Sequence, residues 1–263
     1  MSSTPACRYA RDGHVGTLTL DRPDNRNSMT PELLDAFAAA SAQAKADADA
    51  RCIVVTGTGS SFCAGADFKS VVQRDGDART PAERSYAMYE PFLSLLDLPV
   101  PVIGALNGHA IGGGFGLALA CDIRIGALEA KYGANFVRLG LAPGMAISYL
   151  LPRLVGSARA AELLYSARLV DGREAAALGI LNRAVPATDV LPAALELART
   201  IAENAPFAVR ATKAGIRRGL ALDDAREAAR AEAVAQAESL TMDDAREGIA
   251  ALLGKRPPQF TGR

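Results

Sequence analysis

Two short glycine-rich segments carry the residues best suited to chemistry. Residues 60–69 contain Ala64-Gly65-Ala66, and residues 107–116 contain Gly112-Gly113-Gly114. Small residues let a ligand approach the backbone, and neighbouring amides can point at one acceptor. The second segment also opens a helical pattern, and free N–H groups at a helix start favour an oxyanion or a phosphate. These features predict a site where backbone amides bind a negatively charged oxygen.

The second loop fits neither common nucleotide-binding pattern. A dinucleotide-binding loop needs G-x-G-x-x-G, but the sixth residue counted from Gly112 is Leu117, and no acidic residue lies about 20 positions further on. A P-loop needs Gly-Lys-Ser or Gly-Lys-Thr, which is missing here. For this loop considered alone, close packing of a helix on a strand stays open as the alternative.

The elements that must position these loops are typical of an α/β protein. Apolar, β-branched runs predict strands at residues 15–20, 52–56, 102–106 and 122–125. Thr30 and Pro31 predict the N-cap and the first position of a helix that runs to about Ala50. Because helices separate the strands, crossover connections and a largely parallel sheet are expected.

Helical patterns dominate the chain beyond about Ala142. Helices are predicted at residues 146–155, 158–167, 173–178, 190–204, 207–220, 223–239 and 243–253, and only residues 180–185 look extended. Many of these segments are rich in alanine with interleaved charges, which suits closely packed helices. We divide the chain into a core of residues 1–187 and a helical oligomerisation region of residues 188–263.

Composition narrows the class of protein. The 263 residues are 49% hydrophobic, which is enough for a large core. Lys+Arg and Asp+Glu each number 29, so neither nucleic acid nor an anionic membrane is expected as a partner. Four scattered cysteines and two histidines argue against a metal site and against disulfides. With no signal-like N-terminus and no long apolar run, we expect a soluble cytoplasmic protein.

The two loops together resemble the signature segments of the enoyl-CoA hydratase/isomerase family, also called the crotonase superfamily. The resemblance is carried by residues 54–69 and 101–124, and by Asp21-Arg22-Pro23 with Asn27. It continues through residues 139–144 and 150–156, and into Glu247-Gly248-Ile249 with Lys255-Arg256. It therefore covers nearly the whole chain in order. It implies an α/β fold with a crotonase-like ββα spiral core and a helical C-terminal trimerisation region.

The resemblance also implies a ligand and the residues that bind it. In that family one backbone amide from each loop binds the carbonyl oxygen of an acyl-CoA thioester, and the matching positions here are Ala66 and Gly113. The positions implied for coenzyme A are Asn25, Arg26, Ala64, Lys69, Leu252 and Lys255, the last two often from a neighbouring subunit. Coenzyme A is then part of the substrate, and no separate cofactor is expected. A homotrimer or a dimer of trimers is implied as well.

The chain departs from the family where the proton-transfer chemistry is expected. Family hydratases have one glutamate three residues after the central glycine of the second loop and another four residues before the glycine of the Leu-Gly turn. Here these positions are Gly116 and Phe136. A third acidic position, used by related isomerases and dehalogenases, is Gly144. Because the paired glutamates hold and activate water, the usual hydration mechanism lacks its proton carrier.

Other side chains near the loops are candidates for that task. By position they are Tyr86, Tyr89, Glu90, His109, Tyr132 and Tyr149, each with a structural alternative as a core or wall residue. Cys63 has no predictable histidine partner and is interpreted as a wall residue. Arg138 either pairs with a carboxylate on the acyl group or faces solvent.

Three functions follow from these observations. The first is an enzyme of the lyase or isomerase class in fatty acid metabolism, which acts on acyl-CoA through oxyanion stabilisation. The second is a non-catalytic acyl-CoA carrier or sensor, and the third is a structural subunit of a larger complex. Turnover of acyl-CoA thioesters separates the first two, and affinity for coenzyme A separates both from the third.

Overall fold

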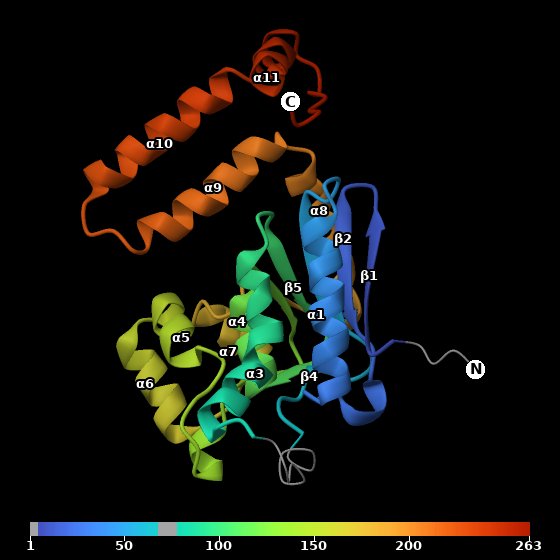
Figure 1. Cartoon of the computed structure of the whole chain (residues 1–263), viewed down its shortest axis with the longest axis vertical. Helices are drawn as coiled ribbons and strands as arrows, with labels where there is room; N and C mark the ends of the chain where they lie inside the picture. Colours follow the sequence, from blue (N-terminus) through green and yellow to red (C-terminus); the bar gives the residue numbers. More distant parts are fainter. Residues whose placement is uncertain (1–4, 68–77) are drawn as a thin grey trace.

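Two sheets of different size form the centre of the molecule (Figure 1). The computed structural model describes residues 5–67 and 78–263. The large sheet contains, in spatial order, β1 (Cys7–Asp12), β2 (Val15–Leu20), β3 (Cys52–Gly57), β5 (Val102–Leu106), β7 (Ile123–Ala127) and β10 (Arg183–Val185). The small sheet contains β4 (Ser61–Cys63), β6 (His109–Ile111), β8 (Lys131–Gly133) and β9 (Val170–Asp171).

The large sheet is mainly parallel, as predicted. β1 pairs with β2 in the antiparallel direction, whereas β2-β3, β3-β5, β5-β7 and β7-β10 are parallel pairs. Residues 52–56 of β3 and all of β5 are buried. Because successive side chains point to opposite faces of a sheet, such strands need cover on both faces. The helices α1 (Pro31–Ala46) and α8 (Val190–Ala202) supply part of that cover.

The start of α1 is confirmed, and its predicted end is wrong by about one turn. The Thr30 hydroxyl accepts a hydrogen bond from the Leu33 amide at 3.2 Å, and Pro31 is the first helical residue. The helix ends at Ala46 because Asp47 takes an extended conformation. The Asp47 carboxylate accepts hydrogen bonds from Tyr9 and Arg11 of β1, at 2.9 and 2.7 Å.

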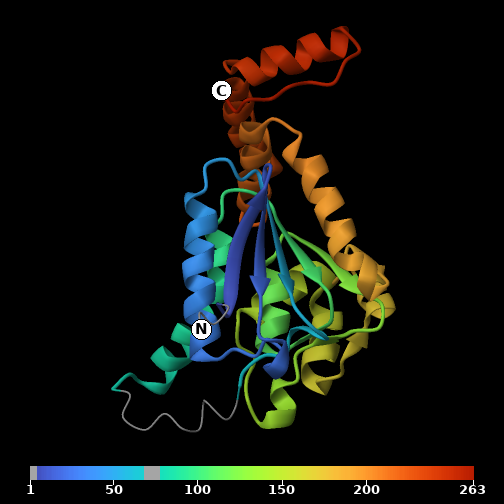
Figure 2. The same ribbon diagram turned by 90° about the vertical axis from the view of Figure 1, so that its right-hand side faces the viewer.

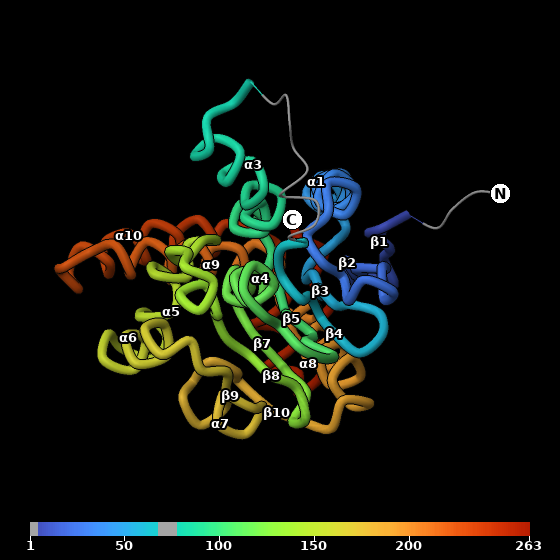
Figure 3. The backbone as a smooth tube through the Cα atoms, turned by 90° about the horizontal axis from the view of Figure 1, so that it is seen from below, coloured from blue at the N-terminus to red at the C-terminus, as the bar shows by residue number. Residues whose placement is uncertain are grey.

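Two further helices lie close to both sheets. α3 (Pro81–Leu93) packs against α1 and against α4 (Gly113–Ala120), and Phe37 of α1 meets Phe92 of α3 edge to face. Every residue of α4 is buried. Figure 3 shows α4 near the middle of the molecule, next to α3 and α5 (Ile147–Val155).

The helices predicted after residue 142 are all present, within two residues of the expected ends. After α5 they are α6 (Ser157–Ser166), α7 (Gly172–Ala177), α8, α9 (Pro206–Gly219), α10 (Ala225–Leu240) and α11 (Asp243–Leu253). α8 packs on the large sheet, whereas α9 to α11 extend from the body (Figures 1 and 2). α8 follows residue 187 but packs with the core. The division of the chain at residue 187 stays a prediction. No helix in the described part of the chain has the length and apolar character needed to cross a membrane.

Candidate active site

The two glycine-rich loops leave the same edge of the small sheet and touch each other. β4 and β6 pair in parallel, with Cys63 opposite Ala110, so the segments that follow both strands emerge side by side. A Cβ atom at Gly65 would lie 2.7 Å from the Ile111 carbonyl oxygen and 3.2 Å from the Gly113 nitrogen. A Cβ atom at Gly114 would overlap the Cys63 carbonyl. Glycine is required at both positions because the two backbones approach so closely.

The amide of Ala66 is available at this contact. Ala66 forms a parallel bridge with Met29, in which the Met29 amide donates to the Gly65 carbonyl at 2.8 Å. The bridge uses the groups that flank Ala66, and no hydrogen bond between described residues uses the Ala66 amide itself.

The amide of Gly113 is available for a different reason. Gly113 is the first residue of α4, and the first N–H groups of a helix have no partner within it. The preceding residue, Gly112, has φ +55°, a conformation that favours glycine. The structure thus brings Ala66 and Gly113, the positions implied for an oxyanion hole, onto adjoining loops. The positive end of the α4 dipole adds to the attraction for an oxyanion.

Residues 135 and 136 face this helix start. A Cβ atom at Gly112 would lie 3.5 Å from Oδ1 of Asn135 and 3.9 Å from the tip of the Phe136 ring. Phe136 is half-buried in the short 3-10 helix η3 (Phe136–Leu139). Asn135 was not singled out from the sequence, although its side chain is polar and stands between the apolar residues Ala134 and Phe136. The wall beside Gly112 is therefore an aromatic ring and a carboxamide.

Position 116 has no room for any side chain. A Cβ atom at Gly116 would overlap the Cβ of Met145, which is fully buried. The neighbouring turn residue, Gly144, faces Tyr89 of α3: a Cβ atom there would lie 2.5 Å from the phenol oxygen. The three positions that the resemblance implied for acids therefore hold a glycine covered by methionine, a phenylalanine, and a glycine covered by tyrosine.

Most of the other candidate proton carriers have structural roles or lie exposed. His109 is exposed, and its Nδ1 accepts a hydrogen bond from the Lys131 amide at 2.9 Å. The buried hydroxyl of Tyr132 donates to the Ala127 carbonyl at 2.8 Å, and burial raises the pKa of this phenol. Tyr149 is 56% exposed and stacks with Arg153.

The remaining candidates are one buried thiol, three exposed side chains and one half-buried tyrosine. Burial raises the pKa of the Cys63 thiol to about 12, so this thiol is a poor nucleophile at neutral pH. Tyr86 and Glu90 are exposed on α3, and Arg138 is exposed in η3. Tyr89 is half-buried and faces the turn at Gly144.

Three of the residues implied for coenzyme A lie together beside the first loop. The Ala64 amide donates to the Arg26 carbonyl at 3.1 Å, and Asn25 ends the 3-10 helix η1 (Pro23–Asn25) just before it. The Arg26 side chain is exposed. Lys69 lies outside the described residues.

Asn27 anchors this segment to the loop. Its buried side-chain oxygen accepts a hydrogen bond from the Arg22 amide at 2.8 Å. Its side-chain nitrogen donates to the Thr58 and Ser61 carbonyls at 3.0 and 2.9 Å. These bonds explain why asparagine is needed where the backbone has φ +54°.

Leu252 and Lys255 lie far from this loop in the same chain. Leu252 is near the end of α11 and is 78% exposed, and Lys255 is exposed just beyond the helix. Figure 1 places α11 at the opposite end of the molecule from β4. Within one chain, the structure therefore does not bring these two residues to the loops.

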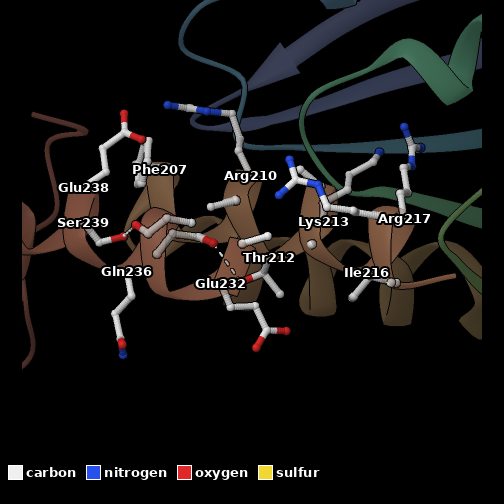
Figure 4. A pocket seen from close by; sticks show the side chains of 18 of the residues that line it. Phe207, Arg210, Thr212, Lys213, Ile216, Arg217, Glu232, Gln236, Glu238 and Ser239 are labelled. Atoms are coloured by element: carbon white, nitrogen blue, oxygen red, sulfur yellow. Dashed lines mark hydrogen bonds between the residues drawn. The ribbon is translucent and has the colours of Figure 1, made fainter. Parts of the chain in front are cut away.

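Two hollows lie away from these loops. One groove of about 1190 Å³ runs between α9 and α10, where Lys213, Arg217 and Glu232 are among its lining residues (Figure 4). A second, of about 880 Å³, lies between α9 and the body near Tyr149 and Leu154. Neither includes Ala66 or Gly113. Within residues 5–67 and 78–263, no group of three or more acidic, histidine or cysteine side chains could hold a metal ion.

Comparison with known proteins identifies the family. The family model for enoyl-CoA hydratase/isomerase matches residues 10–263. The chain is 33% identical over 216 residues to the short-chain-enoyl-CoA hydratase of Clostridium acetobutylicum, which is 81% of each protein. It is 35% identical over 261 residues to the mitochondrial methylglutaconyl-CoA hydratase of Homo sapiens, covering 94% of this chain and 74% of that protein.

The structural comparison agrees with the sequence comparison. The crystal structure of enoyl-CoA hydratase from Bacillus anthracis superposes with a TM-score of 0.91 at 33% identity, over 98% of this chain and 100% of that one. The α/β fold predicted from the resemblance is thereby confirmed. Since the family model spans nearly the whole sequence, this chain belongs to the enoyl-CoA hydratase/isomerase, or crotonase, family.

Proposed function

We propose that the protein binds acyl-CoA thioesters and stabilises the enolate of the acyl group with the backbone amides of Ala66 and Gly113. The observation that carries this proposal is the pair of unused amides on two touching loops, one of them at a helix start. A thioester oxygen gains negative charge when the enolate forms. One preorganised donor in such a site contributes about 3 to 4 kcal/mol to the transition state.

Hydration of 2-enoyl-CoA is not the reaction that this site favours. A general acid or base contributes a factor of about 10² to 10⁴ to the rate. The positions that match the two family glutamates hold Gly116 and Phe136, so neither carries a carboxylate. Met145 fills the space above Gly116, and the Phe136 ring faces Gly112. Both groups are apolar, so they neither hold nor activate the water that hydration needs. A reaction that moves protons on the acyl chain is better supported than hydration.

Coenzyme A is proposed to lie beside the first loop. Arg26 and Ala64 are joined by a backbone hydrogen bond, with Asn25 adjacent, which supports a shared surface for the nucleotide. Lys69 is proposed to reach a phosphate. Leu252 and Lys255 are proposed to reach the site of a neighbouring chain, in a trimer or a dimer of trimers.

A non-catalytic acyl-CoA carrier or sensor is the second candidate. The absence of a carboxylate at Gly116, Phe136 and Gly144 favours it, since a carrier needs the binding groups without the acid and base. Turnover decides between the two. The carrier binds acyl-CoA but returns it unchanged, whereas the enzyme exchanges or shifts protons on the acyl chain.

The proposal is tested by calorimetric binding of hexanoyl-CoA, free coenzyme A and hexanoate to the wild type and to two variants. Gly113→Pro removes the amide hydrogen at a helix position where proline is tolerated. Gly113→Ala is the matched control, because its Cβ also meets the Met29 sulfur but its amide is kept. We expect hexanoyl-CoA to bind most tightly, and Gly113→Pro alone to weaken its binding. Equal affinity of the wild type and a folded Gly113→Pro variant would place the acyl site elsewhere.

A further inference from the structure

The phenol of Tyr89 is a half-buried polar group without a partner in the described part of the chain. Tyr89 lies on α3, which packs against α4, the helix that begins at Gly113. Its hydroxyl makes no hydrogen bond with a described residue. Tyrosine hydroxyls usually find a partner when they are withdrawn from water. This hydroxyl is therefore free to bond a ligand or water.

The hydroxyl of Tyr89 fills the space that a side chain on residue 144 would need. A Cβ atom at Gly144 would lie 2.5 Å from the phenol oxygen and 2.7 Å from the ring carbon that carries it. The Tyr89 hydroxyl, from α3, thus occupies the place that the Cβ atom of an acidic residue at position 144 would take. A side chain at residue 144 would therefore have to displace the Tyr89 hydroxyl.

The turn beneath the hydroxyl is strained and pressed against α4. Met145 and Ala146 have φ +56° and +53°. Left-handed conformations are unfavourable for residues other than glycine, and they persist at functional sites where the surroundings fix them. Met145 is fully buried against Gly116, which lies about 4.5 Å along the helix axis from Gly113. The turn therefore contacts both Tyr89, through Gly144, and α4, through Met145, and α4 is the helix that begins at Gly113.

We infer that Tyr89 is the catalytic acid and base that moves protons on the acyl chain at this site. This inference rests on the proposed function, in which Ala66 and Gly113 hold the thioester oxygen. A tyrosine can serve as such a proton carrier. The other candidates are bonded within the fold, as His109 and Tyr132 are, or are exposed, as Tyr86, Glu90 and Tyr149 are.

For an acyl-CoA with a double bond at carbon 3, the proton transfers balance once Tyr89 has given its own hydroxyl proton to water. The resulting phenolate removes a proton from the α carbon, and the electron pair of that C–H bond enters the dienolate, whose charge rests on the thioester oxygen. The phenol then returns the proton to the γ carbon. A carbon–carbon π pair forms the new C–H bond, the thioester carbonyl is restored, and the double bond is left between carbons 2 and 3. One carrier is sufficient because the phenol formed by the first transfer supplies the proton for the second. Exchange of its hydroxyl proton with the solvent between the two transfers brings in deuterium from D₂O.

The test compares Tyr89→Phe, which removes only the hydroxyl, with Tyr86→Phe as the matched control. Tyr86 lies three residues earlier on α3 and is 62% exposed. Three quantities are measured for each protein. They are the rate of conversion of 3-hexenoyl-CoA to 2-hexenoyl-CoA, the rate of deuterium uptake from D₂O at the α carbon of hexanoyl-CoA, and the affinity for hexanoyl-CoA. We expect Tyr89→Phe to lower both rates about 10²- to 10⁴-fold with unchanged affinity, and Tyr86→Phe to change none of the three.

The possible failures are distinguishable. If Tyr89→Phe keeps both rates while Gly113→Pro lowers them, the oxyanion site stands and Tyr89 is not the acid. If the wild type binds hexanoyl-CoA but catalyses neither reaction, Tyr89 is again excluded and the carrier function is favoured. If the wild type does not bind hexanoyl-CoA, the proposed function fails and the role of Tyr89 fails with it.

Discussion

Glycine residues decide which side chains can enter the candidate site. Gly65 and Gly114 let the two loops meet, and Gly116 leaves room for Met145. Position 116 holds no side chain because Met145 occupies the volume that one would need. The same holds at Gly144, where Tyr89 fills the space. Changes at these positions are coupled to their neighbours and are not expected to act alone.

A glutamate at residue 116 should destabilise the protein instead of restoring hydration. Its Cβ would overlap Met145 in a packed interior, and overpacking costs about 1 to 3 kcal/mol. The added change Met145→Gly should recover part of that loss, since it removes the obstructing Cβ and suits φ +56°. Urea unfolding of wild type, Gly116→Glu and the double variant measures the free energies. A single variant as stable as the wild type would contradict the packing described.

At the scale of elements, the sequence patterns predicted most of the longer strands and helices and missed β1 and several short strands. β3 and β5 are apolar runs, and the C-terminal helices show a clear helical period. β4, β6 and β8 have only three residues each, too few for any periodicity to be recognised. β1 was missed because it is an edge strand with the charged sequence Arg8-Tyr9-Ala10-Arg11-Asp12. The end of α1 depends on contacts of Asp47 with β1, which a local pattern cannot reveal.

The same reasoning explains which parts of the site could be predicted. Ala66 and Gly113 follow from small residues in two local segments and from the family resemblance, and the structure brings their loops together. The contacts of Tyr89 with Gly144 and of Met145 with Gly116 join separate elements. No spacing along the chain encodes them. Asn135 was overlooked because only the neighbouring position, Phe136, carried an expectation.

One prediction at this scale concerns α11 and the C-terminal residues that fold back on it. The Glu247 carboxylate accepts hydrogen bonds from Arg256 at 2.6 and 2.7 Å and from the Gln259 amide at 2.8 Å. Arg256 is the main cause that lowers the pKa of Glu247 from 4.5 to about 2. Because the pKa is lowered in the folded state, this tie stabilises the fold above about pH 4.5 and is lost as the pH falls towards about 2.

The Glu247→Gln variant should therefore lose less stability on acidification than the wild type. Urea unfolding at intervals between pH 5 and pH 2 gives the two curves, and other carboxylates contribute equally to both. The hydrogen-exchange protection of residues 256–262, corrected for the intrinsic exchange rate at each pH, should fall over the same interval in the wild type. Parallel stability curves for the two proteins would mean that the Glu247–Arg256 contact contributes nothing.

At the scale of the whole molecule, the helices α9 to α11 leave apolar side chains uncovered. Ile216, Leu220, Val234 and Leu252 are 64%, 63%, 70% and 78% exposed. α9 is held to the body by the buried Lys213, which pairs with Asp122 and donates to the Val100 carbonyl, both at 2.7 Å. Apolar surface presented on fixed helices favours association with further copies of the chain.

If it forms the proposed trimer or dimer of trimers, the protein should sediment at three or six times the mass of the 27.4 kDa chain. Leu252→Asp should shift it towards smaller species, because it places a charge on the exposed apolar surface of α11. Tyr165→Asp is the matched control, since Tyr165 is 80% exposed but lies on α6 of the body. Sedimentation at micromolar concentration that shows only the single chain would contradict the proposed assembly.

The central claim is that the amides of Ala66 and Gly113 bind the thioester oxygen, and infrared spectroscopy of a bound thioester tests it most directly. The carbonyl stretch of hexanoyl-CoA, labelled with carbon-13 at carbon 1, reports hydrogen bonding to that oxygen. At saturation we predict a lower stretching frequency on the wild type and on Gly113→Ala than in water, and a smaller shift on Gly113→Pro. The same frequency for bound and free thioester, or an equal shift on all three proteins, would contradict the oxyanion hole described.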